Sequence, residues 1–132
     1  MSSHDSPDRS RVLVVDDDLT LRIFTTIVLA REGYSPTAVG NVPRALERVA
    51  EGKVDVVVTD LLMPGLNGLD LLRALRSARL TPPVVAMTGS DEGDLVGRAL
   101  ALGALLVVRK PFTRETLVAA VQYALDEGGA AA

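Results

Sequence analysis

The chain has 132 residues, of which 48% are hydrophobic, and it carries a formal net charge of -3 at pH 7. This length and apolar content fit one domain with a real core, and the acidic balance (sequence pI near 5.1) argues against a broad basic surface for nucleic acid. The chain has no cysteine, no apolar run long enough to cross a bilayer and no signal-like start, so we expect a cytoplasmic protein without membrane insertion or direct nucleic-acid contact.

Composition divides the chain into a central folded region and two ends. Residues 1–10 are polar and predict a flexible N-terminal tail, and the small residues of 128–132 predict a flexible C-terminal tail. Between them, across residues 11–127, strand-like and helix-like patterns alternate. Such alternation predicts an α/β domain with a parallel sheet and helices on both faces.

Hydrophobic periodicity predicts five strands and five helices. Asp18 is a candidate N-cap for the first helix, and Gly33 and Gly52 end the first two helices. Pro36 suits an edge strand. The predicted strands are 11–15, 34–39, 54–59, 84–87 and 105–109. The first predicted helix follows Asp18, the second includes Val42 to Val49, and the third includes Leu69 to Leu75. The fourth begins near Ser90-Asp91, and the fifth runs from Thr113 to Leu125.

The fourth predicted helix contains two glycines, Gly93 and Gly97. Each glycine costs roughly 1 kcal/mol relative to alanine in a helix interior. We therefore expect this helix to be the least firmly held, either as part of a switch or through loose surface packing.

Polar residues stand where four of the predicted strands end. Asp16 and Asp17 follow the first strand, Asp60 the third, Thr88 the fourth and Lys110 the fifth. The carboxyl ends of parallel strands form one crevice, so these side chains are expected to meet there. Adjacent carboxylates raise one another's pKa values unless a cation joins them, and oxygen ligands suit Mg²⁺. A lysine ammonium beside them can pair with an anion such as a phosphoryl group.

The order and spacing of these motifs resemble one family, the receiver domains of two-component response regulators. The resemblance covers residues 11 to 125 and implies a single-domain, chemotaxis-regulator-like, flavodoxin-like fold with strand order 2-1-3-4-5. It rests on Val14-Val15-Asp16-Asp17-Asp18, Asp60-Leu61-Leu62-Met63-Pro64-Gly65-Leu66-Asn67-Gly68, Met87-Thr88-Gly89 and Lys110-Pro111-Phe112.

The resemblance implies that Asp60 takes a phosphoryl group from the phosphohistidine of a sensor histidine kinase or phosphotransfer protein. Asp17, Asp60 and the backbone carbonyl of Leu62 would bind Mg²⁺ directly, and Asp16 would act through metal-bound water. A carboxylate can become an acyl phosphate, and phosphoryl transfer needs mainly alignment and cations. The chain would then catalyse only its own phosphorylation and dephosphorylation, and would not act as an enzyme on other substrates.

The same resemblance implies a switch. The Thr88 hydroxyl would donate to a phosphoryl oxygen and draw the following loop inward, changing a protein-binding surface on the fourth helix, fifth strand and fifth helix. A cis peptide between Lys110 and Pro111 would aim the ammonium into the crevice, because proline makes that isomer accessible.

Two positions depart from the pattern of many receivers. Val107 stands three positions before Lys110, where an aromatic residue usually swings inward, so signalling is expected to rely on repacking of the loop and the fourth helix. Leu62 stands two positions after Asp60 and has no polar side-chain atom to orient an attacking water. We therefore expect a long-lived phosphoryl state.

Two alternatives stay open at the level of sequence. A haloacid dehalogenase-like phosphatase would use Asp16 as its nucleophile, although Leu19 replaces a usual glycine and Asp60 is left without a role. A pseudo-receiver would keep the fold as a protein-binding module without chemistry. The sequence also does not distinguish a free-standing receiver or phosphorelay shuttle from a part of a longer regulator, and it does not identify the kinase or the downstream protein.

Overall fold

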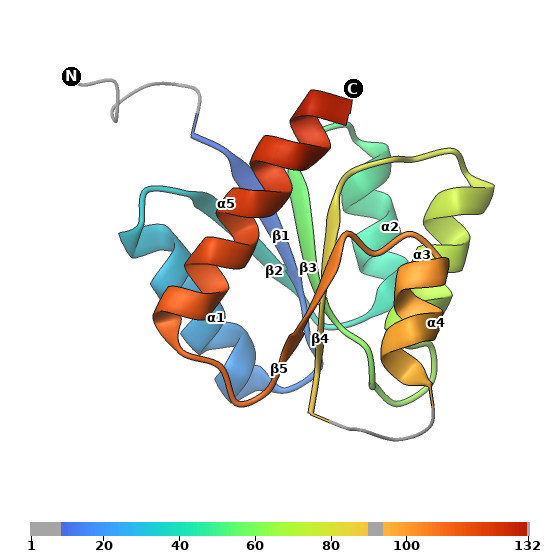
Figure 1. Ribbon diagram of the computed structural model, residues 1–132, viewed down its shortest axis with the longest axis horizontal. Coiled ribbons are helices and arrows are strands. Elements are labelled where there is room, and N and C mark those ends of the chain that lie inside the picture. Colours follow the sequence, from blue (N-terminus) through green and yellow to red (C-terminus); the bar gives the residue numbers. More distant parts are fainter. Residues whose placement is uncertain (1–8, 90–93, 132) are drawn as a thin grey trace.

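The computed structural model describes residues 9–89 and 94–131 (Figure 1). Its strands form one parallel sheet in the order β2-β1-β3-β4-β5, which confirms the predicted fold. The strands are β1 (Arg11–Val15), β2 (Ser35–Val39), β3 (Val56–Asp60), β4 (Val84–Thr88) and β5 (Leu106–Arg109). The helices are α1 (Leu19–Arg31), α2 (Val42–Ala50), α3 (Gly68–Ser77), α4 (Leu95–Ala101) and α5 (Arg114–Ala131).

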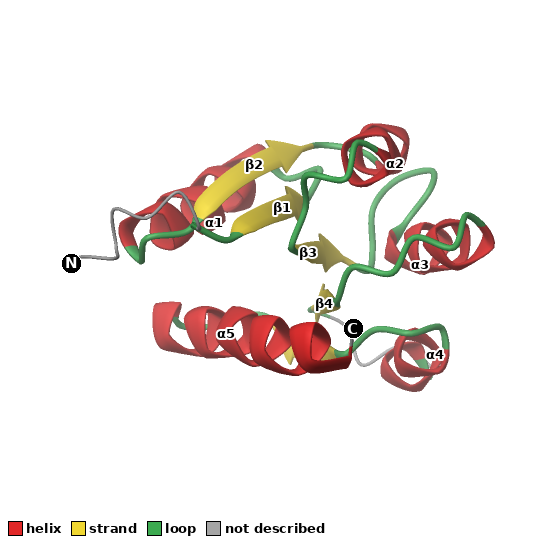
Figure 2. Ribbon diagram, turned by 90° about the horizontal axis from the view of Figure 1, so that it is seen from above, coloured by secondary structure: helices red, strands yellow, loops and turns green. Residues whose placement is uncertain are grey.

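The helices cover both faces of the sheet. Figure 2 shows α1 and α5 on one face, and α2, α3 and α4 on the other. Because successive strand residues point to opposite faces, Val12 and Val14 pack in the core beneath α1 and α5, and Leu13 and Val15 pack beneath α2 and α3. Every residue of β3 and β4 is buried, as expected for central strands with helices on both sides.

Side-chain caps fix where the first three helices begin. Asp18 is the N-cap of α1, as predicted, and its carboxylate accepts from the Leu21 N–H at 3.1 Å. Asn41 caps α2. Asn67 and Asp70 form a reciprocal capping box at α3, which satisfies two otherwise unpaired backbone N–H groups. Each of these helices therefore starts at a defined residue beside the carboxyl edge of the sheet.

Several element boundaries differ from the expected ones. β3 starts at Val56 and includes Asp60, which the sequence analysis had placed just after the strand. The predicted start of the fourth helix, Ser90-Asp91, and Gly93 lie outside the described residues, and α4 is described from Leu95. The expectation that this helix is the least firmly held stays a prediction.

α5 continues through residues 128–131, which the sequence analysis had placed in the C-terminal tail. A Cβ at Gly128 would lie 2.6 Å from the Pro83 side chain, so glycine lets α5 pack closely against the segment before β4. The domain bounds themselves stay predictions. None of the helices in the described parts of the chain is both long and apolar enough to span a membrane.

Candidate functional site

The polar residues predicted to meet lie along one edge of the sheet. Asp60 and Thr88 are the last residues of β3 and β4, whereas Asp16 and Lys110 directly follow β1 and β5. This is the lower edge in Figure 1, where all five strands reach their carboxyl ends. Parallel strands bring these ends together whatever their separation in sequence, and ligands of open α/β sheets bind there.

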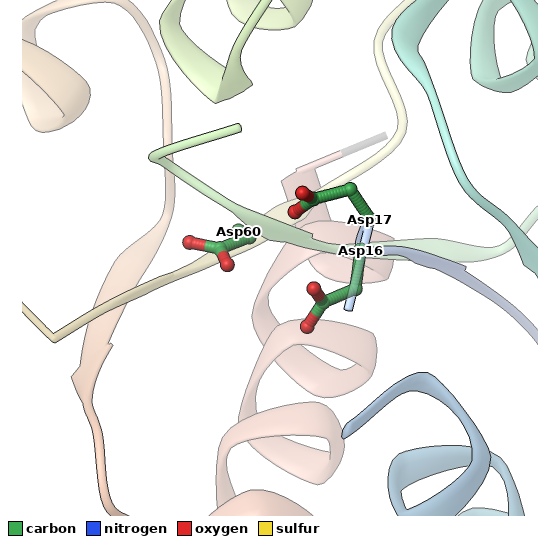
Figure 3. Close-up of side chains that lie close together, drawn as sticks. All are labelled: Asp16, Asp17 and Asp60. Atoms are coloured by element: carbon green, nitrogen blue, oxygen red, sulfur yellow. The ribbon is translucent and has the colours of Figure 1, made fainter. Parts of the chain in front are cut away.

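Three carboxylates form a cluster at the centre of this edge. Asp16, Asp17 and Asp60 each offer an oxygen, and these oxygens lie within 4.8 Å of one another. Figure 3 shows Asp16 and Asp17 beside Asp60. Asp16 and Asp60 are buried, whereas Asp17 is exposed, so the cluster has one side toward solvent. An all-carboxylate donor set suits a hard divalent cation such as Mg²⁺.

Asp16 is fully buried, and only one of its two carboxylate oxygens has a hydrogen-bond partner among the described residues. Its Oδ1 accepts from the Asp18 backbone N–H at 3.0 Å, but its buried Oδ2 has no hydrogen-bond partner among the described residues. Burial raises the pKa of Asp16, and the charges of Asp60 and Asp17 raise it further, against the opposing effects of the Asp18 N–H and Lys110. Such an unpaired oxygen is costly, and a cation held by the three carboxylates would compensate for it, so these residues fit a metal.

Asp60 is held at both carboxylate oxygens. Its Oδ2 accepts from Lys110 Nζ at 2.6 Å, and its Oδ1 accepts from the Leu62 backbone N–H at 3.1 Å. The side chains of Lys110 and Asp60 are 22% and 8% exposed, so the ion pair is largely shielded from solvent and its electrostatic attraction is stronger than at the surface. Asp60 therefore has a fixed orientation and a cation at one oxygen.

Lys110 reaches Asp60 from the turn after β5. Its backbone N–H donates to the Thr88 carbonyl at 2.7 Å, which continues the pairing of β4 and β5 by one residue. The Lys110–Pro111 peptide bond is cis, the isomer that the sequence analysis expected. The Lys110 ammonium and the Asp60 carboxylate thus meet although they are 50 residues apart in sequence.

Thr88 is the last residue of β4, and Val107 lies within β5. Thr88 is fully buried, and in the strand register its neighbour across from β4 is Arg109. Val107 is opposite Ala86 and packs, partly buried, against the core beneath α2, α3 and α4. An aliphatic side chain therefore stands at the position where many receivers have an aromatic ring.

Gly68 is a site residue whose role the sequence analysis missed. A Cβ there would overlap the Asp60 backbone oxygen and lie 2.9 Å from the Leu61 Cα, which are backbone atoms that cannot easily move. The first residue of α3 must therefore be glycine for this helix to approach the end of β3. In sequence, Asn-Gly is an ordinary turn pair, and it does not reveal the close backbone approach, which depends on tertiary packing.

The fold and this site define a doubly wound α/β domain with an acidic, lysine-paired carboxyl edge. A family model described as the response regulator receiver domain matches residues 12–122. The chain therefore belongs to the response regulator receiver domain family, a component of two-component systems. The matched range includes Asp16, the residue on which the phosphatase alternative depended.

Curated relatives include longer regulators. The "DNA-binding response regulator MtrA" of Mycobacterium tuberculosis (strain ATCC 25618 / H37Rv) is 41% identical over 117 residues, which cover 89% of this chain and 51% of the relative. The "Sensory transduction protein RegX3" of Mycolicibacterium smegmatis is 36% identical over 119 residues, with 89% and 51% covered. The chain thus spans about half the length of these relatives.

Solved receiver domains share the fold. A response regulator receiver domain protein from Clostridium thermocellum superposes with a TM-score of 0.86 at 28% identity, covering 93% of this chain and 99% of that one. A CheY-like receiver domain protein from Methanospirillum hungatei JF-1 gives a TM-score of 0.87 at 23% identity, covering 95% and 100%. Because the identity to the Methanospirillum protein is this low, that comparison supports only the fold.

Proposed function

We propose that this chain accepts a phosphoryl group on Asp60 from the phosphohistidine of a sensor histidine kinase or of a phosphotransfer protein. The observation that carries the proposal is the Asp60 carboxylate, held at 2.6 Å by Lys110 beside the carboxylates of Asp16 and Asp17. Membership of the receiver family supports the same conclusion.

In the proposed reaction an oxygen of Asp60 attacks the phosphorus atom. The new O–P bond makes an acyl phosphate as the P–N bond to the donor histidine breaks, and the electron pair of that bond leaves with the imidazole. Lys110, whose ammonium donates to Asp60 at 2.6 Å, would pair with a phosphoryl oxygen and neutralise charge in the transition state. The Leu62 N–H keeps the carboxylate from rotating.

We assign the proposed metal to the acidic cluster. Asp17 and Asp60 would hold Mg²⁺ with the Leu62 backbone carbonyl, and Asp16 would act through a metal-bound water. When bound, Mg²⁺ supplies positive charge that offsets the negative charge of the phosphoryl oxygens. The unpaired Oδ2 of Asp16 supports this assignment, because it is a buried acceptor without a donor among the described residues.

The proposed output is a change in a protein-binding surface. The Thr88 hydroxyl would donate to a phosphoryl oxygen and pull the β4–α4 connection toward Asp60. Since Val107 has no ring to move in concert, the surface formed by α4, β5 and α5 would change through repacking of α4 against the core. The partners would be proteins of the cytoplasm and not nucleic acid. MtrA is described as a DNA-binding response regulator, but this chain matches only about half of its length.

Intact mass spectrometry after incubation with Mg²⁺ and acetyl phosphate tests the proposal. We expect the native chain to gain one base-labile phosphoryl group, and Asp60→Asn to gain none. Asp126→Asn is the matched control, since Asp126 is exposed near the end of α5, and this end packs at Gly128 against the segment before β4, at the opposite edge of the sheet from the acidic cluster.

The other outcomes have defined meanings. No gain by the native chain would favour a pseudo-receiver that binds partners without chemistry. A gain that persists in Asp60→Asn and disappears in Asp16→Asn would favour phosphatase-type chemistry at Asp16.

A further inference from the structure

Arg22, on the first turn of α1, reaches back to the acidic turn after β1. Its guanidinium Nη1 donates a 2.9 Å hydrogen bond to the backbone carbonyl oxygen of Asp16. The same nitrogen occupies space above Gly40, where a Cβ would overlap it and would lie 4.0 Å from the Asp16 carbonyl oxygen. The Arg22 side chain therefore lies in a gap that exists because residue 40 has no side chain.

This hydrogen bond completes the pairing of the Asp16 backbone. The Asp16 N–H donates to the Val39 carbonyl at 3.2 Å, and the Asp16 carbonyl accepts from Arg22. The peptide group that joins Asp16 to Asp17 is planar, so holding its carbonyl oxygen also fixes the direction in which Asp17 leaves the strand. One guanidinium thus restrains two of the three clustered carboxylates.

We propose that Arg22 is a positioning residue for the acidic site, and that Gly40 is the residue that admits it. By fixing the Asp16–Asp17 peptide, Arg22 keeps both carboxylates in the arrangement that a divalent cation needs. Groups that orient metal ligands in this way commonly contribute to affinity without touching the ion. The inference rests on the proposed function in that the cation is the proposed Mg²⁺.

The hydrogen bond and the charge of Arg22 have opposite effects on the affinity for Mg²⁺. A guanidinium near three carboxylates repels an incoming cation, so loss of its charge alone would strengthen Mg²⁺ binding. Loss of its hydrogen bond would loosen the Asp16–Asp17 peptide and weaken binding. Replacing Gly40 separates the two effects, because it displaces the guanidinium and leaves the charge in the molecule.

Gly40→Ala is also a conservative change for the fold. Gly40 does not have a left-handed φ, so alanine brings no backbone strain, and the overlapping atom is the flexible end of a long side chain. The variants are Gly40→Ala, Arg22→Met, the double variant of these two, and Arg22→Lys as the conservative replacement. The control is Arg31→Met, because Arg31 is an exposed arginine at the end of α1.

Two measurements apply to every variant. Isothermal calorimetry of the purified chain with Mg²⁺ alone gives the dissociation constant. Nuclear magnetic resonance of the metal-free chain gives the Asp16 carbonyl carbon and Asp17 amide nitrogen shifts, which report the hydrogen bond directly and which a general loss of stability would not move selectively.

We expect Gly40→Ala and Arg22→Met each to weaken Mg²⁺ binding by about tenfold, the lower end for residues that orient metal ligands. Both should move the same two resonances. The double variant should match Arg22→Met alone, because Gly40 acts through Arg22. Arg22→Lys should recover part of the affinity, and Arg31→Met should behave as the native chain.

Unchanged affinity and unchanged resonances in Gly40→Ala would overturn the inference, as would additive effects in the double variant or tighter binding in Arg22→Met. These results overturn the inference alone as long as the native chain binds Mg²⁺ and is phosphorylated. A native chain that does neither would overturn the proposed function, and the inference with it.

Discussion

Each carboxylate of the acidic cluster has a different local environment. Asp60 is held at both oxygens by donors, Asp16 is buried with one oxygen unpaired among the described residues, and Asp17 is exposed. The exposed Asp17 leaves the cluster open to solvent on one side, where an ion or a phosphoryl group can enter. The buried pair would supply the fixed geometry that the proposed phosphoryl transfer depends on.

Leu62 sets the environment of a proposed phosphoryl group on Asp60. Its side chain is 44% exposed two positions after Asp60, so it can be replaced without opening a cavity. We predict that Leu62→Gln shortens the lifetime of the phosphorylated chain by about five- to tenfold, less than a true general base contributes, because an amide orients a water without taking its proton.

The lifetime is measured as the loss of base-labile label after the phosphodonor is removed. Leu66→Gln is the control, since Leu66 is an exposed leucine of the same loop at 52%. Equal decay of the native chain and Leu62→Gln would contradict the role given to Leu62.

At the scale of the elements, the two ends of the sheet differ in chemistry. The carboxyl edge gathers acidic residues and Lys110, whereas at the opposite edge Arg11 pairs with Asp55. Both the backbone N–H and the guanidinium of Arg11 donate to the Asp55 carboxylate, and the Asp55 N–H donates to the Arg11 carbonyl. These bonds join the start of β1 to the turn before β3, away from the site.

The Asp55 pair predicts a pH dependence of stability. The side-chain hydrogen bond from Arg11 lowers the pKa of Asp55, helped by the Arg11 backbone N–H and charge and opposed by partial burial. A carboxyl whose folded pKa is lowered stabilises the fold fully above its unfolded value of 3.8, and this contribution is lost as the pH falls through the folded pKa.

We therefore expect Asp55→Asn to lower the free energy of unfolding at pH 7 by a small amount, since both partners are partly exposed and solvent screens their interaction. Urea denaturation at pH 7, 5 and 3 should show the difference between native and variant shrinking below about pH 3.8. In an Arg11→Met background Asp55→Asn should have little further effect, and a difference that grows at low pH would contradict the assignment.

At the scale of the whole molecule, the proposed metal links the site to the stability of the domain. The cluster draws on β1 and β3, and Lys110 comes from the end of β5, so the site exists only in the folded chain. A ligand that binds only the native state stabilises it by an amount that grows with the logarithm of its concentration, about 2.7 kcal/mol at one hundred times the dissociation constant.

We predict that millimolar Mg²⁺ raises the thermal midpoint of the native chain and that EDTA reverses the rise. Asp17→Asn should remove most of the effect, because it removes the exposed carboxylate of the cluster. Potassium chloride at matched ionic strength controls for general screening of the net negative charge. The same rise in Asp17→Asn, or with potassium chloride, would contradict a specific site.

The sequence by itself determined which polar residues end the strands. Apolar runs that end on Asp16, Asp60, Thr88 and Lys110 are a local pattern, and parallel strands necessarily bring such ends to one edge. The caps at Asp18 and the glycine stops are local as well, since they depend on the bonding of one helix end. For these reasons the fold class and the members of the acidic cluster could be predicted.

Tertiary structure decided which atoms meet and which positions require glycine. The contact of Lys110 with Oδ2 of Asp60, the unpaired Oδ2 of Asp16 and the Arg22 hydrogen bond above Gly40 depend on side-chain directions across separate elements. Gly40 has an ordinary backbone conformation, so no turn signal marks it. Only the packing of α1 over the β2–α2 turn shows why residue 40 has no side chain, because steric exclusion acts through space and leaves no periodic trace in sequence.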